Sequence, residues 1–184
     1  GTVAGASARP RNDRFDIAIP TTEQRAIAAG WLLLGVAALI GAGLFSILLV
    51  LARTPYVGRL VPAGDFFRIA LVVHVDLSVL VWFISMAGVL WTIDTSRRWS
   101  GLGWIAPWIT GLGALFMAIA PFTGAARPIM SNYVPMLDND VFVYGLMTVG
   151  VGFVALTLRT LVAPAPLGPI DGAGALRLGL RAAA

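Results

Sequence analysis

Four long apolar segments dominate the sequence, and they limit what the chain can fold into more than any other feature. They cover approximately residues 26–52, 66–93, 102–121 and 141–162. Each can cross about 30 Å of hydrocarbon as an α-helix that rises about 1.5 Å per residue. In lipid a helix satisfies its own backbone hydrogen bonds, so all four segments are expected to be helical. With 58% hydrophobic and 12% charged residues among 184, a soluble domain could not hide this apolar surface.

The expected fold class is therefore an all-α integral membrane protein with four transmembrane helices. Residues 1–25 are interpreted as a polar cytoplasmic tail, because they lack the apolar core and cleavage site of a signal peptide. The stretch Pro20-Thr21-Thr22-Glu23 is expected to start the first helix, with a threonine as its cap and Glu23 as an acid in its first turn. Residues 164–184 combine a proline-rich linker with the start of a possible further helix. This ending favours a piece cut from a longer protein over a short interfacial segment.

Arginine counts predict the orientation of the chain. With the N-terminus inside, nine arginines fall on the inner side and four on the outer side, so the positive-inside rule places both ends in the cytoplasm. All 13 basic residues are arginines, and with frequent Ala, Gly and Pro this suggests a multi-pass protein of a bacterial inner membrane. The arginines flank apolar segments instead of forming one stripe, so lipid is expected and nucleic acid is not. The inner set is Arg9, Arg11, Arg14, Arg25, Arg97, Arg98, Arg159, Arg177 and Arg181, and the outer set is Arg53, Arg59, Arg68 and Arg127.

Several chemistries are excluded by the sequence. The chain has no cysteine, which rules out disulfides, iron–sulfur clusters, thiolate zinc sites and covalent c-type haem attachment within it. It also lacks the Walker-type, GxSxG and HExxH motifs. The glycines within the apolar segments are interpreted as sites of close helix packing.

His74, the only histidine, stands inside the second apolar segment. If Asp65 caps that helix, His74 lies about 13 Å along it, between the headgroups and the bilayer centre on the outer half. Ser78 and Ser85 share its stripe of the helix to within about 40°. Two interpretations stay open: a neutral imidazole bonded to a carbonyl or serine of a neighbouring helix, or an axial ligand of haem iron. Zinc or copper is poorly supported, because one histidine without nearby acid or sulfur ligands cannot complete a coordination sphere.

Asp76 is the second ionisable group in this apolar run. It lies about 200° from His74 around the helix, so it cannot orient the same imidazole. An unpaired carboxylate at the bilayer centre costs about 2.5–3.5 kcal/mol on insertion scales. Asp76 is therefore interpreted as a protonated carboxyl bonded between helices, with a proton-relay position as the functional alternative.

The stretch Phe67-Arg68 followed by His74-Val75-Asp76-Leu77-Ser78-Val79-Leu80-Val81-Trp82 resembles the second transmembrane helix of subunit I of the haem–copper oxidases, the cytochrome c oxidase superfamily. Divergent, truncated-looking members of the superfamily are the most similar. The segment Asn132-Tyr133-Val134-Pro135-Met136-Leu137-Asp138 resembles the approach to the fourth helix of the same proteins. The resemblance covers about residues 26–162 and rests on one histidine in the matching helix and these two short phrases.

The resemblance implies that His74 is one axial ligand of a low-spin haem near the outer face, with Ser78 and Ser85 on the haem-facing stripe. Arg68, at the outer end of the helix, is a candidate for a haem propionate by our own geometric reasoning, or else a snorkelling interfacial arginine. The family's other haem ligands and its copper-binding histidines lie on later helices. A copper site therefore exists only if helices outside this chain, from a continuation or a second polypeptide, supply it.

Three hypotheses follow. The first is the N-terminal part, or a split component, of a respiratory oxidase subunit I, catalytically incomplete alone, which accepts electrons from a periplasmic cytochrome or cupredoxin donor and assembles with other oxidase subunits. The second is a non-catalytic membrane scaffold of a larger redox or transport complex, in which His74 and Asp76 are interhelical hydrogen-bonding groups. The third is a quinone- or ion-handling protein that uses Asp76 as a proton site.

Overall fold

The computed structural model describes residues 19–55, 66–124, 126–130, 134–167 and 172–184. Most of these residues are helical, and one short antiparallel hairpin is present. The elements are α1 (Thr22–Ala52), α2 (Phe66–Val75), the π-helix η2 (Asp76–Val81), α3 (Trp82–Ile93), α4 (Ser100–Ile119), the 3-10 turn η3 (Ala120–Phe122), β1 (Arg127–Ile129), β2 (Met136–Asp138), α5 (Asp140–Val162) and α6 (Gly172–Ala182).

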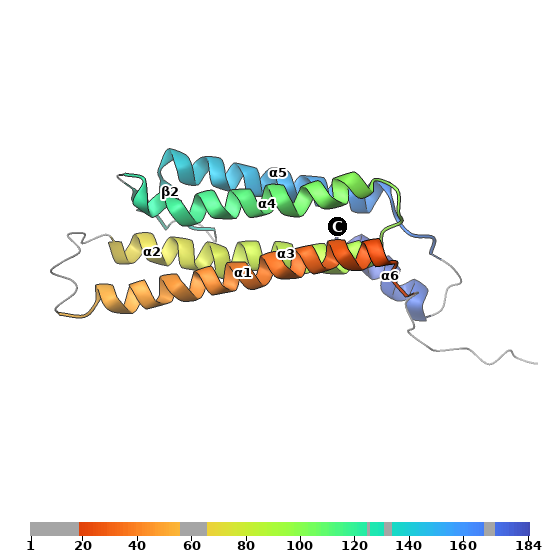
Figure 1. Cartoon of the computed structure of the whole chain (residues 1–184), viewed down its shortest axis with the longest axis horizontal. Helices are drawn as coiled ribbons and strands as arrows, with labels where there is room; N and C mark the ends of the chain where they lie inside the picture. The colour runs from red at the N-terminus through yellow and green to blue at the C-terminus, as the bar shows by residue number, and fades with distance from the viewer. Residues whose placement is uncertain (1–18, 56–65, 125, 131–133, 168–171) are drawn as a thin grey trace, which may run out of the picture.

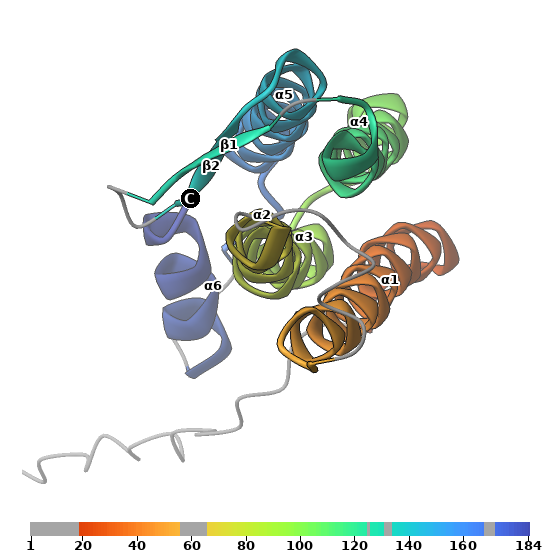
Figure 2. The ribbon, with the colours of Figure 1, turned by 90° about the vertical axis from the view of Figure 1, so that its left-hand side faces the viewer.

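The long helices run side by side along one axis (Figure 1). The elements α2, η2 and α3 form one continuous rod over Phe66–Ile93, and this rod occupies the centre of the bundle. Seen end on in Figure 2, α1 lies on one side of the rod, α4 and α5 form a pair on a second side, and α6 lies on a third. The β1–β2 hairpin contacts α2 and α5.

Chain direction alternates from one long helix to the next, and the start of α1 and the end of α5 lie at the same end of the bundle. The side chain of Gln24, near the start of α1, donates to the carbonyl of Thr95, just after α3. The backbone N–H of Ser96 donates to the carbonyl of Ala163, at the end of α5, over 2.8 Å. The start of α1 and the end of α5 therefore meet, which is the arrangement expected for an even number of crossings. We call this end of the bundle the Arg97 end.

Capping residues fix where two of the helices begin. Thr21 caps α1 through a complete capping box with Gln24, which confirms the expected threonine cap and identifies the threonine. Asn139 caps α5, and its side chain accepts from the N–H of Phe142 over 3.1 Å. The cap expected from Asp65 falls outside the described residues.

Helices α4 and α5 pack with their backbones in contact. A Cβ on Gly113 would lie 2.6 Å from both the carbonyl oxygen of Gly145 and the backbone nitrogen of Val149. A Cβ on Gly152 would lie 2.1 Å from the hydroxyl of Thr110. Gly113, Gly145 and Gly152 therefore act as the close-packing sites that the sequence predicted, whereas Gly150 of α5 faces open space.

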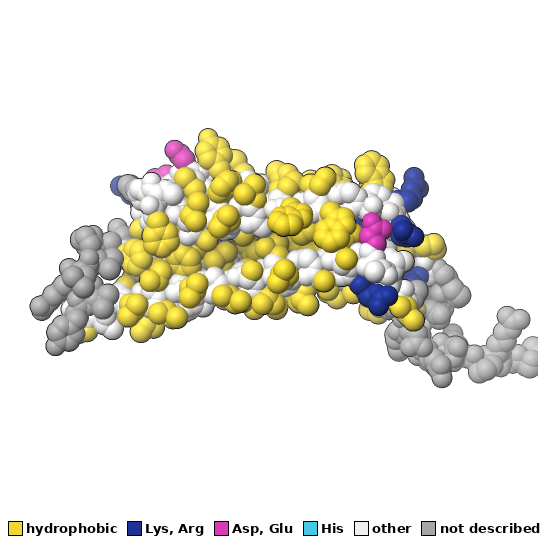
Figure 3. All heavy atoms as spheres, in the orientation of Figure 1, with side chains coloured by type: hydrophobic (Ala, Val, Ile, Leu, Met, Phe, Trp, Pro, Cys, Tyr) yellow, Lys and Arg dark blue, Asp and Glu magenta, His cyan; other side chains and the backbone are white. Residues whose placement is uncertain are grey.

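The outer surface of the bundle is apolar over most of its length. Figure 3 shows one face, on which hydrophobic side chains cover the middle while the arginine and acidic side chains in view gather at the two ends. Four helices of the described part are long and apolar enough to cross a membrane: Thr22–Ala52, Phe66–Ile93, Ser100–Phe122 and Asp140–Val162. The structure is consistent with a multi-pass membrane protein.

Candidate functional site around His74

His74 lies in the last turn of α2 and reaches across to α1. Its Nδ1 atom is 2.8 Å from the carbonyl oxygen of Ala42 and 3.2 Å from the hydroxyl oxygen of Ser46. A carbonyl oxygen can only accept, so Nδ1 carries the proton and donates it to Ala42. This matches the first interpretation of His74, an imidazole bonded to the carbonyl and serine of a neighbouring helix.

The same contact also leaves the other ring nitrogen available. With the proton on Nδ1, Nε2 of a neutral imidazole has a free lone pair. No hydrogen bond to Nε2 occurs among the described residues, and the side chain is half-buried. Histidines that bind metals almost always donate their second N–H to a carbonyl or carboxylate, which fixes the tautomer and the ring orientation. The geometry at His74 therefore suits an axial ligand as well as a structural hydrogen bond.

The helix changes its winding directly after His74. Residues Asp76–Val81 form a π-helix, η2, between two α-helical stretches. The hydroxyl of Ser78 donates to the carbonyl of His74 over 2.7 Å, inside the widened turn. Short π segments in α-helices frequently occur at functional sites. The π segment was not predicted from the sequence, because the angles between residues were derived for a regular α-helix with 100° per residue.

The stripe that carries His74 faces α1. Ser85 is fully buried, and its hydroxyl donates to the carbonyl of Val81 in its own helix over 2.8 Å. A Cβ on Gly35 of α1 would lie 3.1 Å from the Cβ of Ser85. Ser85 therefore packs against α1, and its place on a haem-facing stripe stays a prediction.

Asp76 is buried without a hydrogen-bond partner. Its side chain is 1% exposed, and neither carboxyl oxygen makes a hydrogen bond to any described residue. The interhelical hydrogen bond expected for this carboxyl is therefore not formed within the described part of the chain. Helices α1 and α4 pack against η2, and α4 contains no charged residue. A buried polar group without a partner calls for a functional or structural explanation.

Arg68 lies two turns before His74 and is exposed. It makes no ion pair within the described residues, so its side chain is available at this end of the rod. Its neighbour Phe67 makes a cation–π contact, because the guanidinium of Arg53 lies 4.1 Å from the centre of the Phe67 ring.

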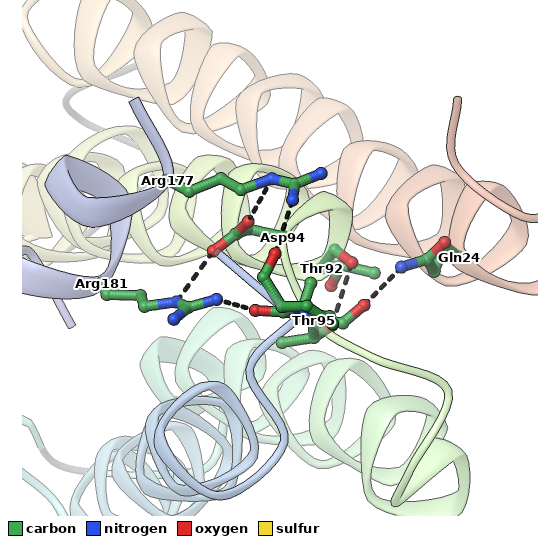
Figure 4. Close-up of polar contacts among 8 residues, drawn as sticks. Gln24, Thr92, Asp94, Thr95, Arg177 and Arg181 are labelled. Atoms are coloured by element: carbon green, nitrogen blue, oxygen red, sulfur yellow. Dashed lines mark hydrogen bonds and ion pairs between the residues drawn. The ribbon is translucent and has the colours of Figure 1, made fainter. Parts of the chain in front are cut away.

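A second polar cluster closes the Arg97 end of the bundle (Figure 4). The carboxylate of Asp94, 3% exposed, lies 3.4 Å from the Nε atoms of both Arg177 and Arg181 of α6. Arg181 also donates to the carbonyl of Ala165. Burial raises the pKa of the Asp94 carboxyl above its ordinary value, and the charges of Arg181 and Arg177 offset part of that rise. These contacts hold α6 against the end of α3.

Arg159, which the sequence analysis counted among the inner arginines, is buried near the end of α5. The side chain is 1% exposed, and its Nε and Nη1 atoms have no hydrogen-bond partner among the described residues. It lies against Gly103 of α4, where a Cβ would come within 2.8 Å of the guanidinium. Sequence reasoning counted Arg159 only as a topology signal, and nothing local in the sequence distinguished it from the exposed arginines.

Metal binding by protein side chains alone has little support in the described ranges. They contain no group of three or more His, Asp and Glu residues that could hold a metal ion. Any iron at His74 would therefore depend on a cofactor that brings its own ligands.

Comparisons with known proteins give relatives without an assigned function. The chain is 30% identical over 164 residues to the uncharacterized protein RP382 of Rickettsia prowazekii (strain Madrid E), a match that covers 76% of this chain and 32% of that protein. It is 29% identical over 132 residues to an uncharacterized protein of Aquifex aeolicus (strain VF5), covering 71% of this chain and 33% of that protein. No family model and no solved structure matches. The chain spans about a third of the length of the curated relatives it matches.

Proposed function

We propose that the chain crosses a bacterial inner membrane four times and forms the haem-binding N-terminal part of a subunit I of the haem–copper oxidase type. His74 would be one axial ligand of a low-spin haem. The observation that carries this proposal is the Nδ1–H donated to Ala42, which leaves Nε2 with a free lone pair on a fixed ring. The sequence resemblance around His74 supports the same role.

The residues around His74 fit an axial imidazole. Ala42 and Ser46 fix the orientation of the ring from α1 through its Nδ1 atom. A bound low-spin haem supplies a one-electron carrier. The protein would adjust the reduction potential of the haem through the strength of the Nδ1 hydrogen bond, because a stronger bond from Nδ1–H to Ala42 raises the basicity of Nε2.

The second axial ligand and any copper ligands would come from outside this chain. His74 is its only histidine, so a bis-histidine pair cannot form here. The matched relatives are about three times as long as the stretch they share with this chain, which leaves room for further helices in proteins of this kind. A continuation or a second polypeptide, other oxidase subunits and a periplasmic electron donor belong to this proposal.

The test is the haem content of the protein purified from its own membranes with its natural partners. We expect a reduced-minus-oxidised spectrum of a low-spin b- or a-type haem, which His74→Ala abolishes. Asp76→Asn is the matched control, because it changes a polar residue in the same helix turn that does not contact the imidazole. An unchanged spectrum in His74→Ala would refute the ligand role.

A second candidate function is a membrane scaffold without its own haem. It is favoured by the interhelical hydrogen bonds of His74 to Ala42 and Ser46, which explain the histidine without a cofactor. In that case the purified complex contains no haem attributable to this chain, and His74→Ala lowers only its stability.

A further inference from the structure

A long apolar groove runs between α1 and α4 on the face shown in Figure 3. Its volume is about 540 Å³, and it is lined by α1 residues from Gly30 to Ala37 and by α4 residues from Trp104 to Leu115. Every lining residue is apolar or aromatic. Gly30 and Gly111 leave the groove open, since a Cβ on Gly30 would meet only Trp104, at 3.9 Å.

The length of the groove matches one leaflet of a bilayer. The lining residues span about 10 Å along α1 and about 16 Å along α4 at 1.5 Å per residue. Half of a hydrocarbon core is about 15 Å thick. A partner transmembrane helix would cross both leaflets and need a groove about twice as long, so a single acyl chain fits this feature better.

The mouth of the groove at the Arg97 end is charged. Glu23 lies two turns before Gly30 on the same face of α1, because seven residues return to within about 20° around a helix. Its carboxylate lies 3.6 Å from Nε of Arg97, so this ion pair connects α1 to the loop before α4 across the mouth. The Arg97 side chain is 75% exposed. The neighbouring side chain of Arg98 is exposed and makes no ion pair within the described residues.

We propose that this groove binds one acyl chain of an anionic phospholipid from the leaflet at the Arg97 end. The phosphate lies at the free donors of Arg97, whose Nε is paired with Glu23, and at the exposed guanidinium of Arg98. Tryptophans such as Trp104 and Trp108 favour the boundary between headgroups and hydrocarbon, which is the depth this arrangement requires. A quinone ring fits less well, because the groove lining offers few polar groups to hold its oxygens.

The inference rests on the membrane location in the proposed function but not on the haem. The test titrates the purified full chain in detergent with phosphatidylglycerol or with phosphatidylcholine of the same acyl chains, and counts bound lipids by native mass spectrometry. We expect a preference for phosphatidylglycerol that falls about fivefold for each arginine removed in Arg97→Gln and Arg98→Gln. Glu23→Gln is expected to raise the preference for phosphatidylglycerol, because the Glu23 carboxylate no longer competes with the lipid phosphate for Arg97.

Groove occupancy is tested separately from headgroup preference. Gly30→Leu fills the groove and should remove the bound lipid, whereas Gly43→Leu, on an open part of the same helix, should not. In the wild-type chain, phosphatidylglycerol with a photoreactive acyl chain should label peptides that contain residues 30–37 and 104–115. Labelling spread evenly over the helices, equal binding of the two lipids, or equal effects of the two leucine variants would overturn the proposal. His74→Ala should leave lipid binding unchanged. A failure of the haem proposal can therefore be distinguished from a failure of the lipid proposal.

Discussion

Two interfaces of the same bundle are built in contrasting ways. Helices α4 and α5 meet through glycines with backbone against backbone, as at Gly113 and Gly145. Helix α1 meets the α2–η2–α3 rod through the ring of Trp31, which lies against Gly88, and through the contact of His74 with Ala42, and α1 also packs against the π segment η2. The first interface maximises close contact. The second contains an irregular helix and the interhelical polar contacts of His74 with Ala42 and Ser46.

The largest expected effect is at the α4–α5 interface. Gly113→Ala should destabilise the fold by about 3 kcal/mol or more, because the new Cβ meets backbone atoms at 2.6 Å and neither helix can yield without losing contacts along its length. The measurement is a denaturant titration followed by circular dichroism. Gly150→Ala in α5, with nothing within 4 Å, is the matched control and should change stability by less than about 0.5 kcal/mol. Equal losses in the two variants would contradict the contrast between the interfaces.

A smaller effect is expected at the α1–α3 contact. Gly88→Ala places a Cβ 2.3 Å from the buried ring of Trp31, which must shift but is a side chain and not backbone. We expect a loss of about 2 kcal/mol in the same titration. Trp31→Phe in the Gly88→Ala background should recover part of the loss, since a smaller ring makes room. Failure of this rescue would mean that Gly88 is needed for another reason.

Replacing the buried carboxyl of Asp76 should raise the stability of the protein, whereas the glycine substitutions lower it. Asp76→Leu is expected to stabilise the protein by about 1 kcal/mol, because an unpaired polar group leaves an apolar site and a side chain of similar size replaces it. Thermal unfolding in detergent measures whether Asp76→Leu raises or lowers the stability. A destabilised Asp76→Leu protein would show that the carboxyl has a partner in the working assembly. Loss of activity in a stabilised variant would assign it a functional role.

The smallest effect concerns the pH dependence at the Arg97 end. Burial raises the pKa of Asp94, so the folded state keeps this proton at pH values where the unfolded state has lost it. The contribution of Asp94 to the free energy of unfolding is therefore fully present below the ordinary carboxyl pKa and is lost as the pH rises through the raised folded-state pKa. Unfolding measured across the acid range should show this slope, and Asp94→Asn should reduce it. An identical pH profile in Asp94→Asn would contradict the assignment.

The candidate site was predictable only in part. The apolar run around His74 identified an unusual imidazole at a definite depth in a helix, because an ionisable group in hydrocarbon is costly wherever it occurs. Its partners Ala42 and Ser46 are about thirty residues away in the sequence, and no local pattern links them to His74. The π segment could not be predicted either, because a helical projection with 100° per residue assumes the same winding along the whole helix.

The four long helices and a threonine cap on the first could be predicted from local sequence, because segment length, apolarity and capping chemistry act within a few residues of the chain. Four features became visible only once the helices were packed together: the free nitrogen of His74, the contact of Ser85 with α1, the burial of Arg159 and the groove between α1 and α4. Each of these depends on which helices meet and in what register. That choice is made by packing between segments far apart in the sequence, where small residues such as Gly35 and Gly103 allow close approach.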